Sequence, residues 1–150
     1  MKVLDLSRRA PGTVLGVLMC AIALAGCTAM RSGVVSQSTL GAGEWKLVVL
    51  NGQAAQPADA SKRPWLRFVA DSNRVQGFGG CNTLNGFFTR ENGELRFGDI
   101  ASTKRACADA SLTQQEQAFA NALGEIDRFE VVDGKLKLQR GSRTIAELTH

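Results

Sequence analysis

The sequence VQGFGGCN at residues 75–82 combines a short strand pattern with three closely spaced glycines. Glycine inside a strand marks a bulge, a sharp bend or the close approach of another segment. A phosphate-binding loop is the competing interpretation, but it requires a lysine and a serine or threonine directly after the last glycine, where Cys81-Asn82 stands instead. Residues 75–82 are therefore predicted to form a sharply bent strand.

Short strands are predicted on both sides of this bend. Asn92-Gly93 and Asp133-Gly134 are typical of the tight turns that join antiparallel strands in hairpins. Trp45 and Trp65 are predicted to be core residues. Alternating apolar and polar residues indicate strands at about 44–50, 65–69, 75–78, 87–88, 95–97, 129–132, 136–138 and 144–148. Closely spaced strands of this kind favour an antiparallel sheet that curls toward a barrel.

One segment has the period of a helix instead. Ser111 with Gln114, or Thr113 with Glu116, offers a capping box at its start. Its apolar stripe consists of Leu112, Phe119, Ala122, Leu123 and Ile126. The predicted fold class is therefore mostly β (α+β), a small antiparallel barrel-like curled sheet with one amphipathic helix packed on it.

Residues 1–26 resemble the signal peptide of a bacterial lipoprotein. They have a basic start and an apolar stretch shorter than the roughly 20 residues that a membrane-spanning helix needs. Arg8-Arg9 leaves a twin-arginine signal open, although Ala10-Pro11-Gly12 follows where such a signal has bulky apolar residues. Leu24-Ala25-Gly26-Cys27 resembles a lipobox, after which Cys27 would become the first residue and carry covalent lipid.

The lipid on Cys27 predicts a membrane anchor, because more than one acyl chain holds a protein firmly on a bilayer. Residues 27–42 are predicted to be the lipidated N-terminus and a flexible tether, since they are mostly small and polar. In similar lipoproteins an aspartate after the cysteine retains the protein in the inner membrane. Thr28 therefore favours the outer membrane, with the domain facing the periplasm.

The remaining cysteines predict a disulfide. Cys20 leaves with the signal peptide and Cys27 carries lipid, so Cys81 and Cys107 remain in an oxidising compartment. Two buried free thiols are the alternative. No metal site is expected, because the one histidine is His150 and two cysteines do not complete a zinc site.

Charge and composition argue against several functional classes. The full sequence carries a formal charge of +4, and residues 1–26 hold three basic and one acidic residue, which leaves +2 for the mature chain. Without a basic patch interleaved with aromatics, nucleic acid is not an expected partner. Catalytic triads lack an internal histidine here, and Asp99, Asp109 and Glu116 are interpreted as turn or helix-capping residues. The protein is expected not to be an enzyme, to have no catalytic residues, and to need no cofactor beyond the lipid on Cys27.

Asn82 and Asn85 are the candidate binding residues. They would bind a ligand at a loop beside the bent strand. Asparagine also hydrogen-bonds the backbone of turns, so a purely structural role stays open for both. Lys104 and Arg105 are expected on a solvated face.

The central motifs resemble those of the META domain family, which includes a bacterial heat-shock protein. The resemblance rests on Gly77-Phe78-Gly79-Gly80-Cys81-Asn82, Asn85-Gly86 and Thr103-Lys104-Arg105-Ala106-Cys107, and it extends over about residues 43–148. Arg105 departs from the pattern, because many similar proteins have methionine there. The resemblance implies a small barrel-like β domain at residues 43–150, often exported and lipidated, linked to stress tolerance and antibiotic resistance, without an established enzymatic reaction.

Three functions follow as hypotheses. The first is an envelope lipoprotein that binds another envelope component, such as a protein. The second is a carrier of a small apolar ligand, which a cavity lined by Phe68, Phe78 and Phe87 would favour. The third is a thiol redox protein that uses Cys81 and Cys107, although a catalytic pair usually stands closer in sequence.

Overall fold

The computed structural model describes residues 40, 41, 43–57 and 62–150. The chain divides into two units, residues 1–32 and 33–150, and all described residues belong to the second. The predicted signal peptide, Cys27 and nearly all of the predicted tether lie outside the described residues. Leu40, near the end of that tether, is buried and accepts a hydrogen bond from the Trp45 indole. The folded domain therefore includes Leu40.

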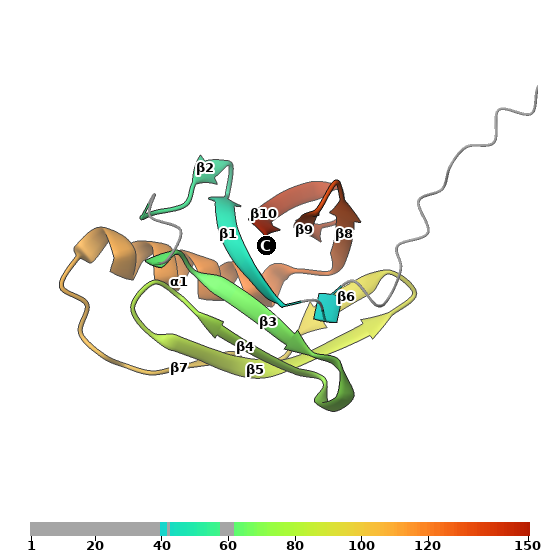
Figure 1. Ribbon diagram of the computed structural model, residues 1–150, viewed down its shortest axis with the longest axis horizontal. Helices are drawn as coiled ribbons and strands as arrows, with labels where there is room; N and C mark the ends of the chain where they lie inside the picture. Colours follow the sequence, from blue (N-terminus) through green and yellow to red (C-terminus); the bar gives the residue numbers. More distant parts are fainter. Residues whose placement is uncertain (1–39, 42, 58–61) are drawn as a thin grey trace, which may run out of the picture. The chain divides into compact units, whose positions relative to one another are not determined.

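The described residues form ten strands of one antiparallel sheet and one packed helix (Figure 1). The strands are β1 (Glu44–Leu50), β2 (Gln53–Ala54), β3 (Trp65–Val69), β4 (Arg74–Phe78), β5 (Thr83–Glu91), β6 (Glu94–Phe97), β7 (Ala101–Ser102), β8 (Arg128–Val132), β9 (Lys135–Arg140) and β10 (Arg143–Thr149). The helix α1 spans Ala110–Glu125, and a short 3-10 turn, η3 (Ala70–Ser72), joins β3 to β4.

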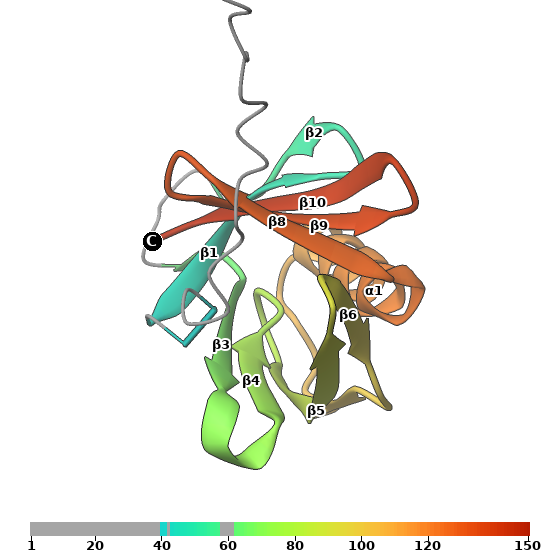
Figure 2. The ribbon, with the colours of Figure 1, turned by 90° about the vertical axis from the view of Figure 1, so that its right-hand side faces the viewer.

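The sheet curls until its first and last long strands meet (Figure 2). The strand order is β10-β9-β8-β6-β5-β4-β3-β1-β2, with β7 beside β5, and β1 also pairs with β10 to close a ring. The ring is not a regular barrel, because β6 joins β8 through the single pair Glu94 and Arg128. The predicted fold class, a curled antiparallel sheet with one packed helix, is confirmed.

The predicted hairpin turns are present and have the backbone that their residues favour. Asn92 and Gly93 have φ angles of 49° and 83°, and Asp133 and Gly134 have 51° and 72°. Positive φ at both central residues is the requirement of the type I′ hairpin turn. The first turn sets the register of β5 on β6, and the second sets that of β8 on β9.

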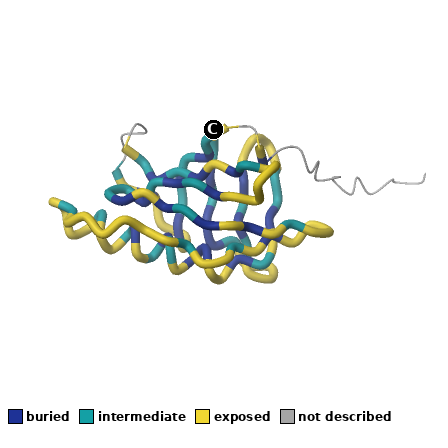
Figure 3. The backbone as a smooth tube through the Cα atoms, turned by 90° about the horizontal axis from the view of Figure 1, so that it is seen from below, coloured by how far each residue is buried: buried dark blue, intermediate teal, exposed yellow. Residues whose placement is uncertain are grey.

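The core lies inside the ring, and buried residues alternate with more exposed ones along β3, β4 and β9 (Figure 3). Phe68 meets Phe88 edge-to-face at 5.2 Å between ring centroids, and Phe97 packs beside them. The helix contributes the fully buried Phe119 and Leu123 from its apolar stripe. Packing of this stripe against the inner face of the sheet holds α1 in place.

The start of the helix differs from the prediction. Asp109 is the N-cap, because the helix begins one residue before Ser111. The Asp109 carboxylate accepts hydrogen bonds from the Ser111 hydroxyl and backbone N–H, and these bonds lower the pKa of Asp109. The interpretation of Asp109 as a capping residue is thus confirmed, whereas the capping boxes that begin at Ser111 or Thr113 are wrong.

Candidate functional site

Asn82 lies in a buried hydrogen-bond network that joins the turn between β4 and β5 to α1. Its side chain is 5% exposed, and its amide nitrogen donates to Glu116 Oε1 at 2.7 Å. Glu116 Oε2 accepts the backbone N–H of Cys81 at 3.1 Å and that of Asn82 at 2.6 Å. The Glu116 carboxylate thereby satisfies three donors that point into the protein. We call Asn82, Glu116 and their partners the Asn82–Glu116 network.

The other side of Asn82 holds the segment before the helix. Asn82 Oδ1 accepts from the Thr103 hydroxyl at 2.9 Å and from the Arg105 backbone N–H at 2.8 Å. Asn82 Nδ2 also donates to the Arg105 carbonyl at 3.3 Å. One asparagine in the turn after β4 therefore bonds both α1 and the chain leading into it. With its amide oxygen and nitrogen both hydrogen-bonded within the protein, Asn82 has a structural role, and its role as a binding residue stays a prediction.

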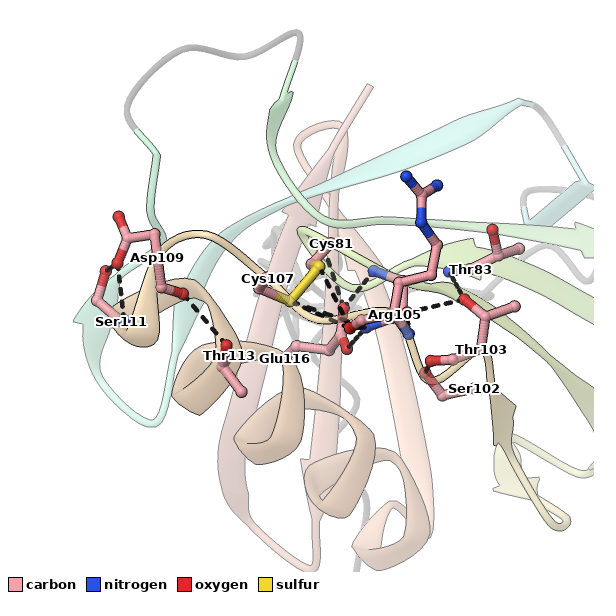
Figure 4. Close-up of a disulfide and its surroundings, with 11 residues drawn as sticks. Cys81, Thr83, Ser102, Thr103, Arg105, Cys107, Asp109, Ser111, Thr113 and Glu116 are labelled. Atoms are coloured by element: carbon pink, nitrogen blue, oxygen red, sulfur yellow. Dashed lines mark hydrogen bonds between the residues drawn. A yellow bond between two sulfur atoms is a disulfide. The ribbon is translucent and has the colours of Figure 1, made fainter.

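Cys81 and Cys107 form the predicted disulfide next to this network (Figure 4). Their Cα atoms lie 5.8 Å apart. Figure 4 shows Glu116 reaching from α1 toward the two cysteines and Arg105. The covalent bond and the hydrogen bonds thus connect the same two segments of the chain.

The glycines of β4 and of the turn after it, Gly77, Gly79 and Gly80, make these close contacts possible. A Cβ at residue 79 would overlap the Glu116 side chain, and a Cβ at residue 77 would lie 2.7 Å from the Trp65 carbonyl oxygen. Gly80 has a φ of +117°, a conformation that other residues rarely adopt. The predicted close approach is confirmed, with Glu116 as the neighbour. The predicted bent strand over residues 75–82 is wrong, because β4 ends at Phe78 and residues 79–82 form the turn into β5, closed by a hydrogen bond from the Gly79 N–H to the Asn82 carbonyl.

Glu116 was missed as a site residue, because its position near the helix start suggested a cap. The spacing of residues along the helix nevertheless indicates that Glu116 lies on the buried face. Leu112, Glu116, Phe119 and Leu123 follow the spacing of one helix face, so Glu116 interrupts an apolar stripe. A carboxylate at such a position must be paired when it is buried.

Asn85 lies apart from Asn82, on the outside of the sheet. It belongs to β5 and is the cross-strand neighbour of Gln76 on β4. Successive residues of a strand point to opposite faces, and Leu84 and Phe88 of the same strand are buried inside the ring. The outward side chains of β3, β4 and β5 include those that we call the aromatic face: Trp65, Arg67, Arg74, Gln76, Phe78, Asn85 and Phe87.

The aromatic face combines exposed rings with guanidinium groups. Phe87 is 59% exposed, the highest value among the large apolar side chains that the structure describes. The Arg74 guanidinium lies over its ring, 5.6 Å from the centroid, and Arg67 lies 5.7 Å from the Trp65 ring centroid. Arg67 also pairs with Glu44 at 2.6 Å. The prediction that Trp65 is a core residue is wrong, because Trp65 is half-buried on this outer face, whereas Trp45 is buried as predicted.

The cavity expected for a carrier does not form from the predicted residues. Phe68 points into the core, while Phe78 and Phe87 lie on the outer face. The three rings therefore lie on opposite sides of the sheet. A pocket of about 380 Å³ beside α1 has a different lining that includes Asn82, Lys104, Glu116 and Gln117.

Comparison with known proteins identifies the family. Residues 38–149 match the family model of the META domain. This chain belongs to the META domain family. In this META domain, Asn82 of the glycine-rich motif binds Thr103 and Arg105 of the second motif. Because Arg105 takes part through its backbone, the departure from methionine at this position leaves the network intact.

Two NMR structures share the fold of this META domain. An NMR structure of a protein from Burkholderia xenovorans is 28% identical, with a TM-score of 0.57 over 73% of this chain and 80% of that chain. Another NMR structure is 22% identical, with a TM-score of 0.57 over 73% and 90%. A crystal structure of a DUF4847 family protein from Bacteroides vulgatus is 18% identical, with a TM-score of 0.49 over 75% and 94%. The comparison with curated proteins finds no match.

The described residues contain neither a cluster of metal-binding side chains nor a membrane-spanning helix. Residues 40–41, 43–57 and 62–150 contain no group of three or more histidine, cysteine or acidic side chains that could hold a metal ion. The same residues contain no helix that is long and apolar enough to cross a membrane, and α1 does not meet this requirement either.

Proposed function

We propose that this META domain is a lipid-anchored, non-enzymatic binding domain of the bacterial cell envelope, which supports stress or antibiotic tolerance by binding another envelope component. The aromatic face is the observation that carries the proposal. Aromatic and arginine side chains are the groups that binding surfaces favour. Phe87 and Arg74 present such groups to solvent on a rigid sheet.

The opposite part of the sheet provides a contrast that supports this choice. On β8, β9 and β10 the outward residues Glu130, Lys137 and Glu147 lie side by side as a row of alternating charges. These charged side chains leave that part of the surface hydrophilic, and opposite charges on neighbouring strands are favourable. The aromatic face instead exposes the apolar ring of Phe87 to solvent, so it is the better candidate for a binding surface.

The two alternative functions have less support. The carrier hypothesis required Phe68, Phe78 and Phe87 around one cavity, and they lie on opposite sides of the sheet. For the redox hypothesis, the disulfide stands beside the buried Asn82–Glu116 network, where it links the turn after β4 to the segment before α1. This position favours a structural disulfide.

The binding surface can be tested by photo-crosslinking in intact cells. A photoreactive phenylalanine analogue at position 87 is expected to give crosslinked products in the envelope. The same analogue at Lys135, an exposed outward residue of β9, serves as the control. Equal crosslinking patterns at the two positions, or none at position 87, would contradict the proposal.

The anchor can be tested separately. Cys27→Ser removes the thiol that would carry the lipid, so the protein is expected to leave the membrane fraction and to lack the mass of the acyl chains. The measurement is fractionation followed by intact-mass analysis, with Cys20→Ser as the control, since Cys20 precedes the predicted cleavage point. A Cys27→Ser protein that stays with the membrane would overturn the lipid anchor.

A further inference from the structure

We infer that the aromatic face binds an acidic glycan, namely the glycan strand of the bacterial cell wall after its peptides have been removed, which carries a free carboxylate on every second sugar. The inference rests on the proposed binding function and names the partner of the same face. Sugar rings present C–H groups that pack flat against aromatic rings, while their hydroxyl groups need hydrogen-bond partners at the edges. The aromatic face offers both kinds of group.

The rings supply the apolar part of the site. Trp65 and Phe78 are direct cross-strand neighbours on β3 and β4, and Phe87 stands two rows further along on β5. Neighbouring strands lie about 4.8 Å apart and same-face residues about 6.8 Å apart along a strand, so the rings are spread over about 10 by 14 Å. This area suits a disaccharide better than a single sugar or a large folded partner.

The amides supply the polar part. Arg67, Gln76 and Asn85 form one row across β3, β4 and β5, between the row of Trp65 and that of Phe87. An amide offers both a donor and an acceptor, which matches a sugar hydroxyl that needs both. In the part of the chain that the structure describes, the side chains of Gln76 and Asn85 make no hydrogen bond to another residue.

The charges select an acidic sugar over a neutral one. Glu44 pairs with Arg67, whereas Arg74 makes no salt bridge with another described residue and is held over Phe87. Lys46 adds a second cation beside Trp65. A guanidinium fixed in this way is ready to bind a carboxylate, for which its planar fork is well suited. The aromatic face has about the size of a disaccharide and holds one guanidinium, that of Arg74, without a salt bridge to another described residue. This matches a glycan with one carboxylate per disaccharide.

The test measures binding by the lipidated protein purified from membranes in detergent. The probes are cell-wall glycan strands freed of their peptides, which carry one lactyl carboxylate per disaccharide, and chitotetraose, a neutral sugar chain of similar backbone. A thymidine oligonucleotide tests whether any anion with flat rings is enough. The glycan strands are expected to bind, and chitotetraose to bind about tenfold more weakly because it lacks the carboxylate.

Two variants locate the site. Phe87→Ala and Arg74→Gln are each expected to weaken binding of the glycan strands by about tenfold. Lys135→Gln on β9 removes the same charge from a different face and is expected to leave binding unchanged. Since Phe87 and Arg74 are exposed, the unfolding temperatures should stay the same, which separates lost binding from lost fold.

The possible outcomes are distinct. Glycan binding that Phe87→Ala and Arg74→Gln leave intact, or tighter binding of the oligonucleotide, would overturn the inference. Failure of the glycan strands to bind, together with crosslinks from position 87 to an envelope protein, would overturn the glycan partner but leave the proposed binding function standing. Absence of both would overturn the two proposals together.

Discussion

Replacing Glu116 with alanine is expected to lower the free energy of unfolding by about 3–5 kcal/mol. The variant removes the acceptor of the backbone N–H groups of Cys81 and Asn82 and of one hydrogen of the Asn82 amide, and Asn82 itself is buried. A domain of this size has a total stability of about 5–15 kcal/mol, so the variant should be close to its folding limit. The measurement is urea unfolding, followed by tryptophan fluorescence.

Gln117→Ala is the matched control for this experiment. Gln117 is the next residue of α1 and is exposed, so its replacement should change the free energy of unfolding by less than about 0.5 kcal/mol. Glu116→Gln keeps one acceptor oxygen and should fall between the wild type and the alanine variant. A loss of less than about 1 kcal/mol in Glu116→Ala would mean that the network contributes little, because each unpaired buried donor should cost at least that much.

Removing the disulfide with the double substitution Cys81→Ser and Cys107→Ser is expected to cost about 3.5 kcal/mol. The bond closes a loop with a sequence separation of 26, and its loss gives the unfolded chain more freedom. The fold should survive under mild conditions, because Asn82 still holds Thr103 and Arg105 by hydrogen bonds.

The control for the disulfide is chemical. Reduced wild-type protein should unfold at the same urea concentration as the double variant, and the reducing agent should not change the variant. Equal stability of the oxidised wild type and the variant would show that the disulfide does not stabilise the domain.

Local sequence patterns predicted the turns and strands whose conformation depends on neighbouring residues in the sequence. Asn92-Gly93 and Asp133-Gly134 accept positive φ at low cost, so their turns and the flanking strands could be located from the sequence. The strands β2 and β7 were missed, because each has two residues and is held by backbone pairing that leaves no periodic pattern.

The site depended on contacts over long sequence distances. Glu116 lies 34 residues from Asn82, and the motif around Asn82 does not say which helix residue will meet it. The adjacent phenylalanines of β5 posed a different problem. Phe87 and Phe88 are equally apolar, and only the pairing of the strand determines that Phe88 enters the core while Phe87 faces solvent.

The pairing of β1 with β10 has a consequence for how the domain is made. These strands lie at the two ends of the folded unit, so the ring cannot close until Thr149 has reached Lys46. A chain that emerges from a ribosome or a translocation pore from its N-terminus therefore leaves the β10 side of β1 unpaired until β10 has emerged. Contacts between such distant segments slow folding and prolong exposure of apolar strands. Newly delivered chains should thus depend on holding chaperones for longer than a helical protein of equal length would.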